Sequence, residues 1–271
     1  MTQLYKPNIA VDSIEEYSNL IIGIQGPPAS GKTAASLTFP NPIVALFERP
    51  DLAGLKQLDI LKDVNPILLP FYDIKWMEEK KLPGRLFNPP NENRTINDSA
   101  GAFLQWLGGK DAREITNQQT LILDNWTRLQ EQFDEVNWSY KSLSKDGKVD
   151  DWAPWDRKIT FAEEISNNLI SLSCNVVVLF HEIQERDKAT GLLLDKLQPL
   201  QQGKFIAKLK SYYPNFFRQH CRSIKDANGK DTTEIEYMWQ VKSGSGFDAK
   251  CSKPKLPTFI PAQYKSLLIS S

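Results

Sequence analysis

The residues with the clearest chemical potential lie in one short stretch near the start of the chain. Residues 26–33 have the sequence Gly-Pro-Pro-Ala-Ser-Gly-Lys-Thr, which fits the pattern G-x-x-x-x-G-K-[ST] of a phosphate-binding loop. In such a loop the glycines let the backbone turn its N–H groups onto phosphate oxygens. Lys32 can then reach the β- and γ-phosphates, and the Thr33 hydroxyl can ligate Mg²⁺. The pattern predicts a nucleotide site formed by Gly26, Pro27, Pro28, Ala29, Ser30, Gly31, Lys32 and Thr33.

The segments on either side of this loop have the order that the motif needs. The apolar run Leu20–Ile24 predicts a buried strand, and residues 34–39 predict a helix. A helix that begins at the end of the loop adds its partial positive charge to the phosphate site. A chance glycine turn is the alternative, but it would not explain the full spacing, the strand before it and the Lys-Thr ending.

Two carboxylates each follow a further predicted strand. Residues 43–47 lead to Glu48, and residues 120–123 lead to Asp124. Ligands of parallel α/β sheets bind outside the carboxyl ends of the strands, so both side chains are expected near the loop. We predict that Asp124 holds Mg²⁺ and that Glu48 orients or deprotonates the attacking water. The alternatives are a helix-capping Asp124 and a Glu48 that only begins a helix-like turn.

A third apolar run, residues 175–180, ends at His181. A polar side chain at this position can sense the γ-phosphate and pass its state to the loop that follows. A cap or a core hydrogen bond is an equal alternative for His181. Residues 184–203 predict a hairpin or a flexible excursion, whose cations Arg186 and Lys196 either meet DNA phosphates or lie on a solvated face.

The remaining segments carry weaker signals. Residues 71–98 predict an insertion or lid over the core. Trp152 and Trp155 can stack on bases, although anchoring of a loop to the core is the favoured interpretation. Residues 216–242 predict a β-hairpin around a turn at 226–230.

A glycine-rich and then basic tail follows this hairpin. Its lysines, Lys242, Lys250 and Lys253, either reach the nucleotide of a neighbouring subunit or are plain surface residues. The expected organisation is one domain over residues 1–271, with the insertion at 71–98 and the hairpin and tail at 215–271.

Composition excludes several classes of protein. The 271 residues carry 33 basic and 33 acidic side chains, so bulk charge points to neither nucleic acid nor a membrane surface. The three cysteines form no C-x-x-C pair, which is typical of reduced thiols. The start of the chain lacks a signal-peptide pattern, and no apolar run approaches about 18 residues. We therefore expect an intracellular, cytoplasmic protein that contacts no membrane.

The order of these motifs resembles that of the RecA-like phosphate-loop ATPases. The resemblance is closest to phage nucleotide-binding proteins of the AAA_24 type, which include single-strand-annealing and recombination ATPases. It spans about residues 20–260 and rests on the phosphate loop, the strand before Glu48, the segment Asp124-Asn125-Trp126-Thr127, the strand before His181 and residues 199–204.

The resemblance implies an α/β fold: a RecA-like core with a mostly parallel sheet, helices on both faces and a C-terminal antiparallel hairpin. It implies ATP with Mg²⁺ as cofactors, a ring or filament of identical subunits, and single-stranded DNA as partner, with a single-strand-binding protein as a further possible partner. Glu48, Lys32, His181 and Lys250 are its candidate catalytic residues. The host cytoplasm is the expected location if the protein is phage-encoded.

Two other functions fit the same motifs. One is a slowly hydrolysing, nucleotide-gated mediator or loader that acts through protein contacts. The other is a phosphate-loop kinase, which needs an arginine-rich lid; residues 71–98 offer only Arg85 and Arg94.

Overall fold

The computed structural model describes residues 19–50, 62–82, 99–139, 148–187, 190–200, 205–225, 230–244, 246–253 and 255–268. Some of the segments discussed above lie wholly or mostly outside these residues: the helix-like turn that follows Glu48, most of the insertion at 71–98, residues 201–204 and the hairpin turn at 226–230.

The core of the fold is a nine-stranded sheet with the order β3-β2-β4-β5-β1-β7-β8-β9, to which β6 adds by pairing with β5. Neighbouring strands from β3 to β7 run parallel, whereas β6, β8 and β9 pair antiparallel. The strands are β1 (Ile21–Gly26), β2 (Pro42–Leu46), β3 (Ile67–Pro70), β4 (Thr120–Asp124), β5 (Asn175–Arg186), β6 (Leu193–Pro199), β7 (Asn215–Lys225), β8 (Asp231–Gln240) and β9 (Phe259–Pro261). The predicted α/β class, with its mostly parallel sheet and C-terminal hairpin, is confirmed.

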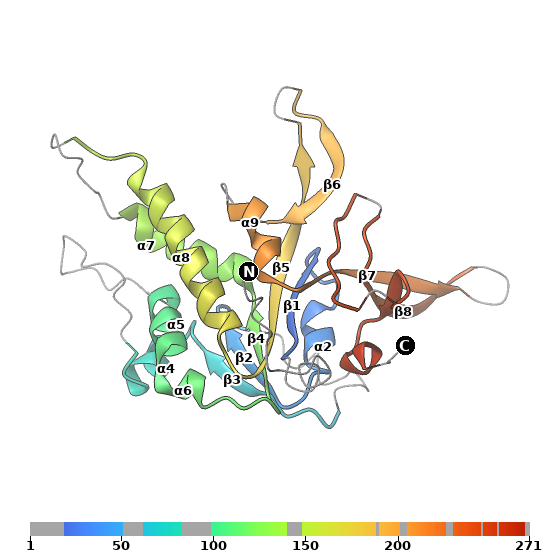
Figure 1. Cartoon of the computed structure of the whole chain (residues 1–271), viewed down its shortest axis with the longest axis horizontal. Coiled ribbons are helices and arrows are strands. Elements are labelled where there is room, and N and C mark those ends of the chain that lie inside the picture. Colours follow the sequence, from blue (N-terminus) through green and yellow to red (C-terminus); the bar gives the residue numbers. More distant parts are fainter. Residues whose placement is uncertain are drawn as a thin grey trace, which may run out of the picture.

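Helices cover both faces of this sheet (Figure 1). They are α2 (Lys32–Ser36), α4 (Ile74–Glu79), α5 (Ser99–Gly108), α6 (Lys110–Arg113), α7 (Trp126–Ser139), α8 (Ala153–Ile170), α9 (Phe205–Tyr212) and the 3₁₀ helix η2 (Tyr264–Leu267). Because side chains alternate along a strand, each central strand contributes side chains to two apolar clusters, one on each face of the sheet. Leu121 and Leu123 point to the face of α5, α7 and α8, while Ile122 points to the face of α2.

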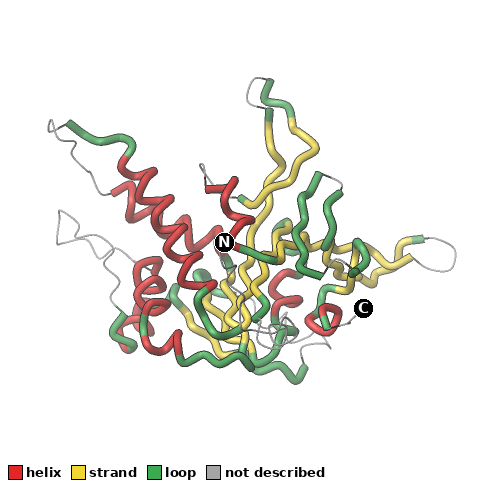
Figure 2. The backbone as a smooth tube through the Cα atoms, viewed as in Figure 1, coloured by secondary structure: helices red, strands yellow, loops and turns green. Residues whose placement is uncertain are grey.

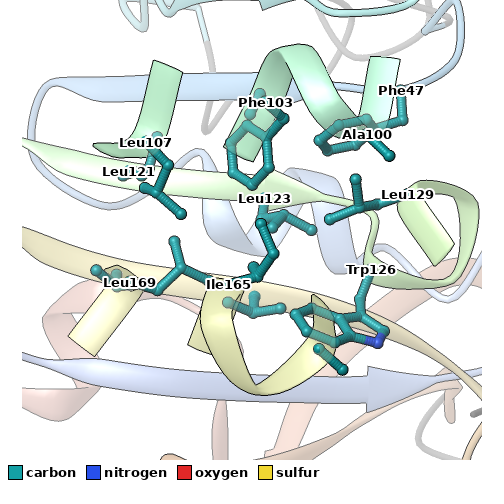
Figure 3. Close-up of a cluster of buried hydrophobic side chains, with 14 of the residues drawn as sticks. Phe47, Ala100, Phe103, Leu107, Leu121, Leu123, Trp126, Leu129, Ile165 and Leu169 are labelled. Atoms are coloured by element: carbon teal, nitrogen blue, oxygen red, sulfur yellow. The ribbon is translucent and has the colours of Figure 1, made fainter. Parts of the chain in front are cut away.

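The larger cluster packs three long helices onto the middle of the sheet. Figure 3 shows Phe103 of α5, Leu129 of α7 and Ile165 of α8 converging on β4. All three side chains are almost fully buried. Burial of a large apolar side chain stabilises by about 1.5–3 kcal/mol, so this cluster holds β4 and its terminal Asp124 in place.

Three elements differ from the sequence-based expectation. β5 continues six residues past Phe180, because its outer half pairs with β6 rather than ending at the sheet. β7 lies parallel to β1 inside the main sheet, so the C-terminal hairpin is a continuation of the core. α8 begins at Ala153, so Trp155 lies in a helix and not in the loop expected from the sequence, and Pro154 occupies a position in the first turn where proline is favoured.

Two β-hairpins extend away from the body of the molecule. Figure 2 shows the outer half of β5 with β6 in one direction and the outer ends of β7 and β8 in another. Both hairpins start from strands that flank β1. Among the described helices, none has the length and apolar character needed to cross a bilayer.

Candidate active site

The strand order brings the predicted functional side chains to one edge of the sheet. β5 lies between β1, which leads into the phosphate loop, and β4, which ends at Asp124. His181 is paired with Gly26, and Leu46, two residues before Glu48, is paired with Asp124. The carboxyl ends of four neighbouring strands therefore meet around the loop.

Lys32 lies folded against its own loop. Its Nζ atom donates hydrogen bonds to the carbonyl oxygens of Gly26 and Pro27, at 2.9 and 2.7 Å. Burial lowers the pKa of Lys32 to about 8, although the nearby carboxylates of Asp124 and Glu182 act to raise it. The side chain is thus a cation held next to the loop in a poorly solvated place. Its electrostatic attraction for an anionic ligand is stronger there than it would be in water.

The loop itself turns sharply at two residues with positive φ. Ala29 has φ of 59° and Gly31 of 82°. Pro27, Pro28 and Ala29 are exposed, whereas the Ser30 side chain is buried. Within the described residues the Ser30 hydroxyl has no hydrogen-bond partner.

Thr33 and Asp124 are in direct contact across the sheet. The Thr33 Oγ1 hydroxyl donates to Asp124 Oδ2 at 2.8 Å. Burial raises the pKa of Asp124, and it does so against the hydrogen bond from Thr33 and the charge of Lys32, which both favour the carboxylate. Two hard oxygen donors therefore lie side by side at the start of α2.

Glu48 joins this group through Asn125. The Asn125 Nδ2 amide donates to Glu48 Oε1 at 3.2 Å, while Asn125 Oδ1 accepts from the backbone N–H of Arg128 at 2.8 Å. The same Asn125 side chain thus caps α7 and orients the carboxylate. Glu48 itself is exposed, and Gln132 supports its strand end by donating to the Phe47 carbonyl at 2.6 Å.

His181 occupies the strand end between the loop and Asp124. Its backbone N–H donates to Thr127 Oγ1 at 3.3 Å. Its Nδ1 atom is buried and, among the described residues, has no hydrogen-bond partner. Burial, together with the nearby Lys32 ammonium, lowers the pKa of His181, so the neutral imidazole is favoured at neutral pH.

The C-terminal hairpin packs directly against both glycines of the loop. A Cβ atom at Gly31 would lie 2.5 Å from the Tyr237 ring, and one at Gly26 would lie 3.0 Å from the Cβ of Gln219. Gln219 is in turn held by the indole N–H of Trp239, which donates to its Oε1 at 2.8 Å. The two glycines are therefore required by packing as well as by backbone conformation.

Sequence reasoning missed a buried ion pair under the loop. Arg218 of β7 and Glu182 of β5 form two hydrogen bonds, at 3.0 and 2.9 Å, and Gln25 also donates to Glu182 at 3.4 Å. Their contact depends on β7 lying beside β1, which no local pattern predicts. The available signal was the presence of polar residues in strands that are otherwise apolar.

Lys250 lies apart from the group around Lys32. Its backbone pairs with Phe216, and its Nζ donates to the carbonyl oxygen of Lys210 at 3.4 Å. The side chains that carry the predicted roles gather without it, so any part in phosphate binding would involve a neighbouring molecule.

The two tryptophans after α7, Trp152 and Trp155, differ in how far they are buried. Trp152 is 76% exposed, so the anchoring interpretation is wrong for this residue. Trp155 is half-buried and packs edge-on against Trp138, at 5.4 Å between ring centroids.

Comparisons with known proteins agree with the phosphate-loop architecture. The AAA_24 family model, described as an AAA domain, matches residues 18–250. No curated protein matches this chain.

Solved structures with a similar arrangement share little sequence with it. The RadB recombinase has 10% identity and a TM-score of 0.38, with 82% of this chain and 87% of that chain covered. A KaiC-like protein from the hyperthermophilic archaeon Pyrococcus horikoshii has 8% identity and a TM-score of 0.34, with coverage of 86% and 82%.

Proposed function

Because this chain belongs to the AAA_24 family of AAA domains, we propose that it is an ATPase that binds and hydrolyses MgATP at the loop formed by residues 26–33. The contact between Thr33 and Asp124 is the observation that supports this most strongly. It joins the last residue of the loop motif to the carboxylate that ends β4, at 2.8 Å. Phosphate-loop ATPases divide metal binding between these two residue types.

The neighbouring side chains supply the remaining roles. Lys32 binds the β- and γ-phosphates with its ammonium group, and the turn at Gly31 aims backbone N–H groups at the phosphates. Glu48, oriented by Asn125, positions the attacking water and accepts its proton. His181 senses the γ-phosphate through its unpartnered Nδ1 atom.

The donor atoms present fit Mg²⁺. A hydroxyl and a carboxylate oxygen are hard ligands, and Mg²⁺ in phosphate-binding sites takes one or two such protein ligands while keeping waters and phosphate oxygens. In agreement, the described residues contain no cluster of three or more His, Cys, Asp or Glu side chains that could form an all-protein cage. When bound, Mg²⁺ would neutralise phosphate charge and keep Asp124 ionised.

Substitution of Lys32 tests the proposal. Lys32→Ala removes the cation that meets the transferred phosphate, so we expect ATP turnover to fall by about 100-fold or more. The exposed Lys110, whose partner is Glu114 at 3.2 Å, offers a matched control, and Lys110→Ala should hydrolyse ATP at the unchanged rate. A Lys32→Ala protein with full turnover would contradict the proposal.

We further propose that ATP turnover serves single-stranded DNA, in recombination, annealing or replication of a phage, by an oligomer in the host cytoplasm. The resemblance to AAA_24 proteins is the main support. The 76% exposed Trp152 ring adds a surface on which a base can stack. Arg186 at the end of β5 adds a cation on the projecting hairpin.

ATP turnover with and without single-stranded DNA tests this second part, alongside particle mass with and without nucleotide. Stimulation by DNA together with nucleotide-dependent assembly would support it. A DNA-independent monomer would favour the slowly hydrolysing mediator. Turnover that requires a separate acceptor would favour a kinase; Arg85 and Arg94, the arginines of its supposed lid, lie outside the described residues.

A further inference from the structure

A buried ion pair lies beneath the phosphate loop and has no role in the reaction proposed above. Glu182 follows His181 on β5, and its side chain is only 7% exposed. Arg218 on β7 donates from Nε to one carboxylate oxygen at 3.0 Å and from Nη2 to the other at 2.9 Å. This two-bond arrangement is the strong, geometrically specific form of an arginine–carboxylate contact.

The pair spans the strand that carries the loop. Gln25 is paired with Phe180 on the β5 side of β1 and with Arg218 on the β7 side. Its side-chain amide donates to Glu182 at 3.4 Å, and Gln25 is fully buried. Side chains from three adjacent strands are therefore tied together one residue before Gly26.

The charge of Glu182 matters because the site above it binds an anion. Glu182 directly follows His181, which is paired with Gly26, and the Lys32 Nζ atom donates to the Gly26 carbonyl at 2.9 Å, so the Glu182 carboxylate lies close to the Lys32 ammonium. A carboxylate without a partner at this position would compete with phosphate for Lys32. It would also repel the phosphates directly, and in a poorly solvated site such repulsion is strong.

We propose that Arg218 is a positioning residue for nucleotide binding, which neutralises Glu182 so that the Lys32 ammonium stays available to phosphate. This inference rests on the proposed binding of nucleotide at the loop. It assigns Arg218 no contact with the nucleotide itself. It also explains why a buried carboxylate is tolerated next to a phosphate site, since a buried charge normally requires a partner.

The proposal predicts effects of opposite sign for the two members of the pair. In Arg218→Gln, the uncompensated Glu182 should weaken binding of MgADP and MgATPγS by about tenfold or more. In Glu182→Gln, a free Arg218 cation remains below the loop, so affinity should be unchanged or higher. The double variant removes both charges and should return to within about threefold of the wild-type affinity.

Isothermal titration calorimetry with MgADP and MgATPγS measures these affinities, and thermal unfolding reports on the fold of each variant. A pair that only stabilises the fold would instead lower affinity in both single variants. The exposed pair of Arg222 and Glu236, at 2.8 Å on the same hairpin, provides the control. Arg222→Gln and Glu236→Gln should leave both affinities unchanged.

Arg218→Gln carries a risk of misfolding, because it leaves the buried Glu182 carboxylate without its cationic partner. In that case the other two variants decide. Glu182→Gln and the double variant with wild-type or tighter binding support the proposal, and weaker binding in both overturns it. A wild-type protein that binds neither nucleotide would instead refute the proposed function, so the two failures are distinguishable.

Discussion

The two hairpins that flank β1 begin in the same way and differ in what they contact. β5 and β7 both run parallel to β1, and both continue beyond the sheet into an antiparallel pair. The inner part of β7–β8 packs against Gly26 and Gly31 and is closed on its far side by β9. The outer part of β5–β6 instead carries exposed apolar side chains, including Ile183, Leu192 and Leu193.

This difference means that the two hairpins support the phosphate loop to different degrees. The β7–β8 hairpin is part of the support of the nucleotide site, since a change in its packing reaches the loop backbone directly. Within the described part of the chain, the outer β5–β6 hairpin joins the site at the strand end formed by His181 and Glu182. Substitutions in the inner part of the β7–β8 hairpin should therefore affect both stability and nucleotide binding, and substitutions in the outer β5–β6 hairpin should spare both.

Glycine substitutions provide the largest expected contrast. Gly31→Ala forces a side chain into φ of 82° and against the Tyr237 ring, so we expect a loss of about 2–3 kcal/mol of stability and severely weakened nucleotide binding. Gly191→Ala in the other hairpin also has positive φ, at 70°, but no atom within 4 Å, and should cost only about 1 kcal/mol. Urea unfolding and MgADP titration measure both.

A second comparison separates packing from backbone strain in the same experiment. Combining Gly31→Ala with Tyr237→Ala should recover part of the lost affinity, because the ring that the new methyl group meets is gone. If the double variant is no better than Gly31→Ala alone, contact between the hairpin and the loop is not what limits binding.

A pH titration should give an effect of intermediate size, at Lys32, the first residue of α2. Burial lowers the Lys32 pKa from 10.5 to about 8, and phosphate binding needs the protonated form. The protonated fraction, and with it the affinity for MgADP, should therefore fall by about 30-fold as pH rises from 7 to about 9.5. The Lys32→Arg variant, whose cation does not titrate, should show no such change whatever its affinity. A flat wild-type profile would contradict the assignment.

The same pKa has the opposite consequence for folding. Between pH 8 and 10.5 the unfolded chain holds a proton on Lys32 that the folded chain releases. The contribution of Lys32 to the free energy of unfolding therefore rises with pH across this window, and it is constant below it. Comparing the pH dependence of wild-type and Lys32→Met unfolding isolates this contribution.

The smallest effect is expected at the outer β5–β6 hairpin. Leu192 is 68% exposed, and Leu192→Ser should change stability by no more than about 0.5 kcal/mol and leave basal ATP turnover unchanged. Differential scanning calorimetry and a DNA-free turnover assay check this. A marked loss in either would mean that the outer hairpin supports the nucleotide site after all.

Much of the site could be placed from sequence because its parts are local. The loop pattern identified Lys32 and Thr33, and apolar runs ending in a polar residue identified Asp124 and His181. Parallel topology then implied that these strand ends meet. The structure brings them together as that reasoning required.

What could not be predicted depends on contacts between distant segments. Arg218 and Glu182 are 36 residues apart, and Tyr237 lies far from Gly31 along the chain. Both contacts require β7 to join the sheet beside β1, whereas the sequence indicated only a hairpin. The alternation and turn that indicate a hairpin predict that two strands pair with each other. They do not predict a third neighbouring strand, which here is β1.

The length of β5 has a mechanical consequence. This strand of 12 residues runs from the middle of the sheet to Arg186, with one shift in its pairing with β6 between Gln184 and Arg186, so its outer half is an arm that begins at His181. Five residues at about 3.3 Å each give an arm of about 17 Å. A tilt of about 10° at His181 would carry the outer end of the strand by about 3 Å, which is about the length of a hydrogen bond.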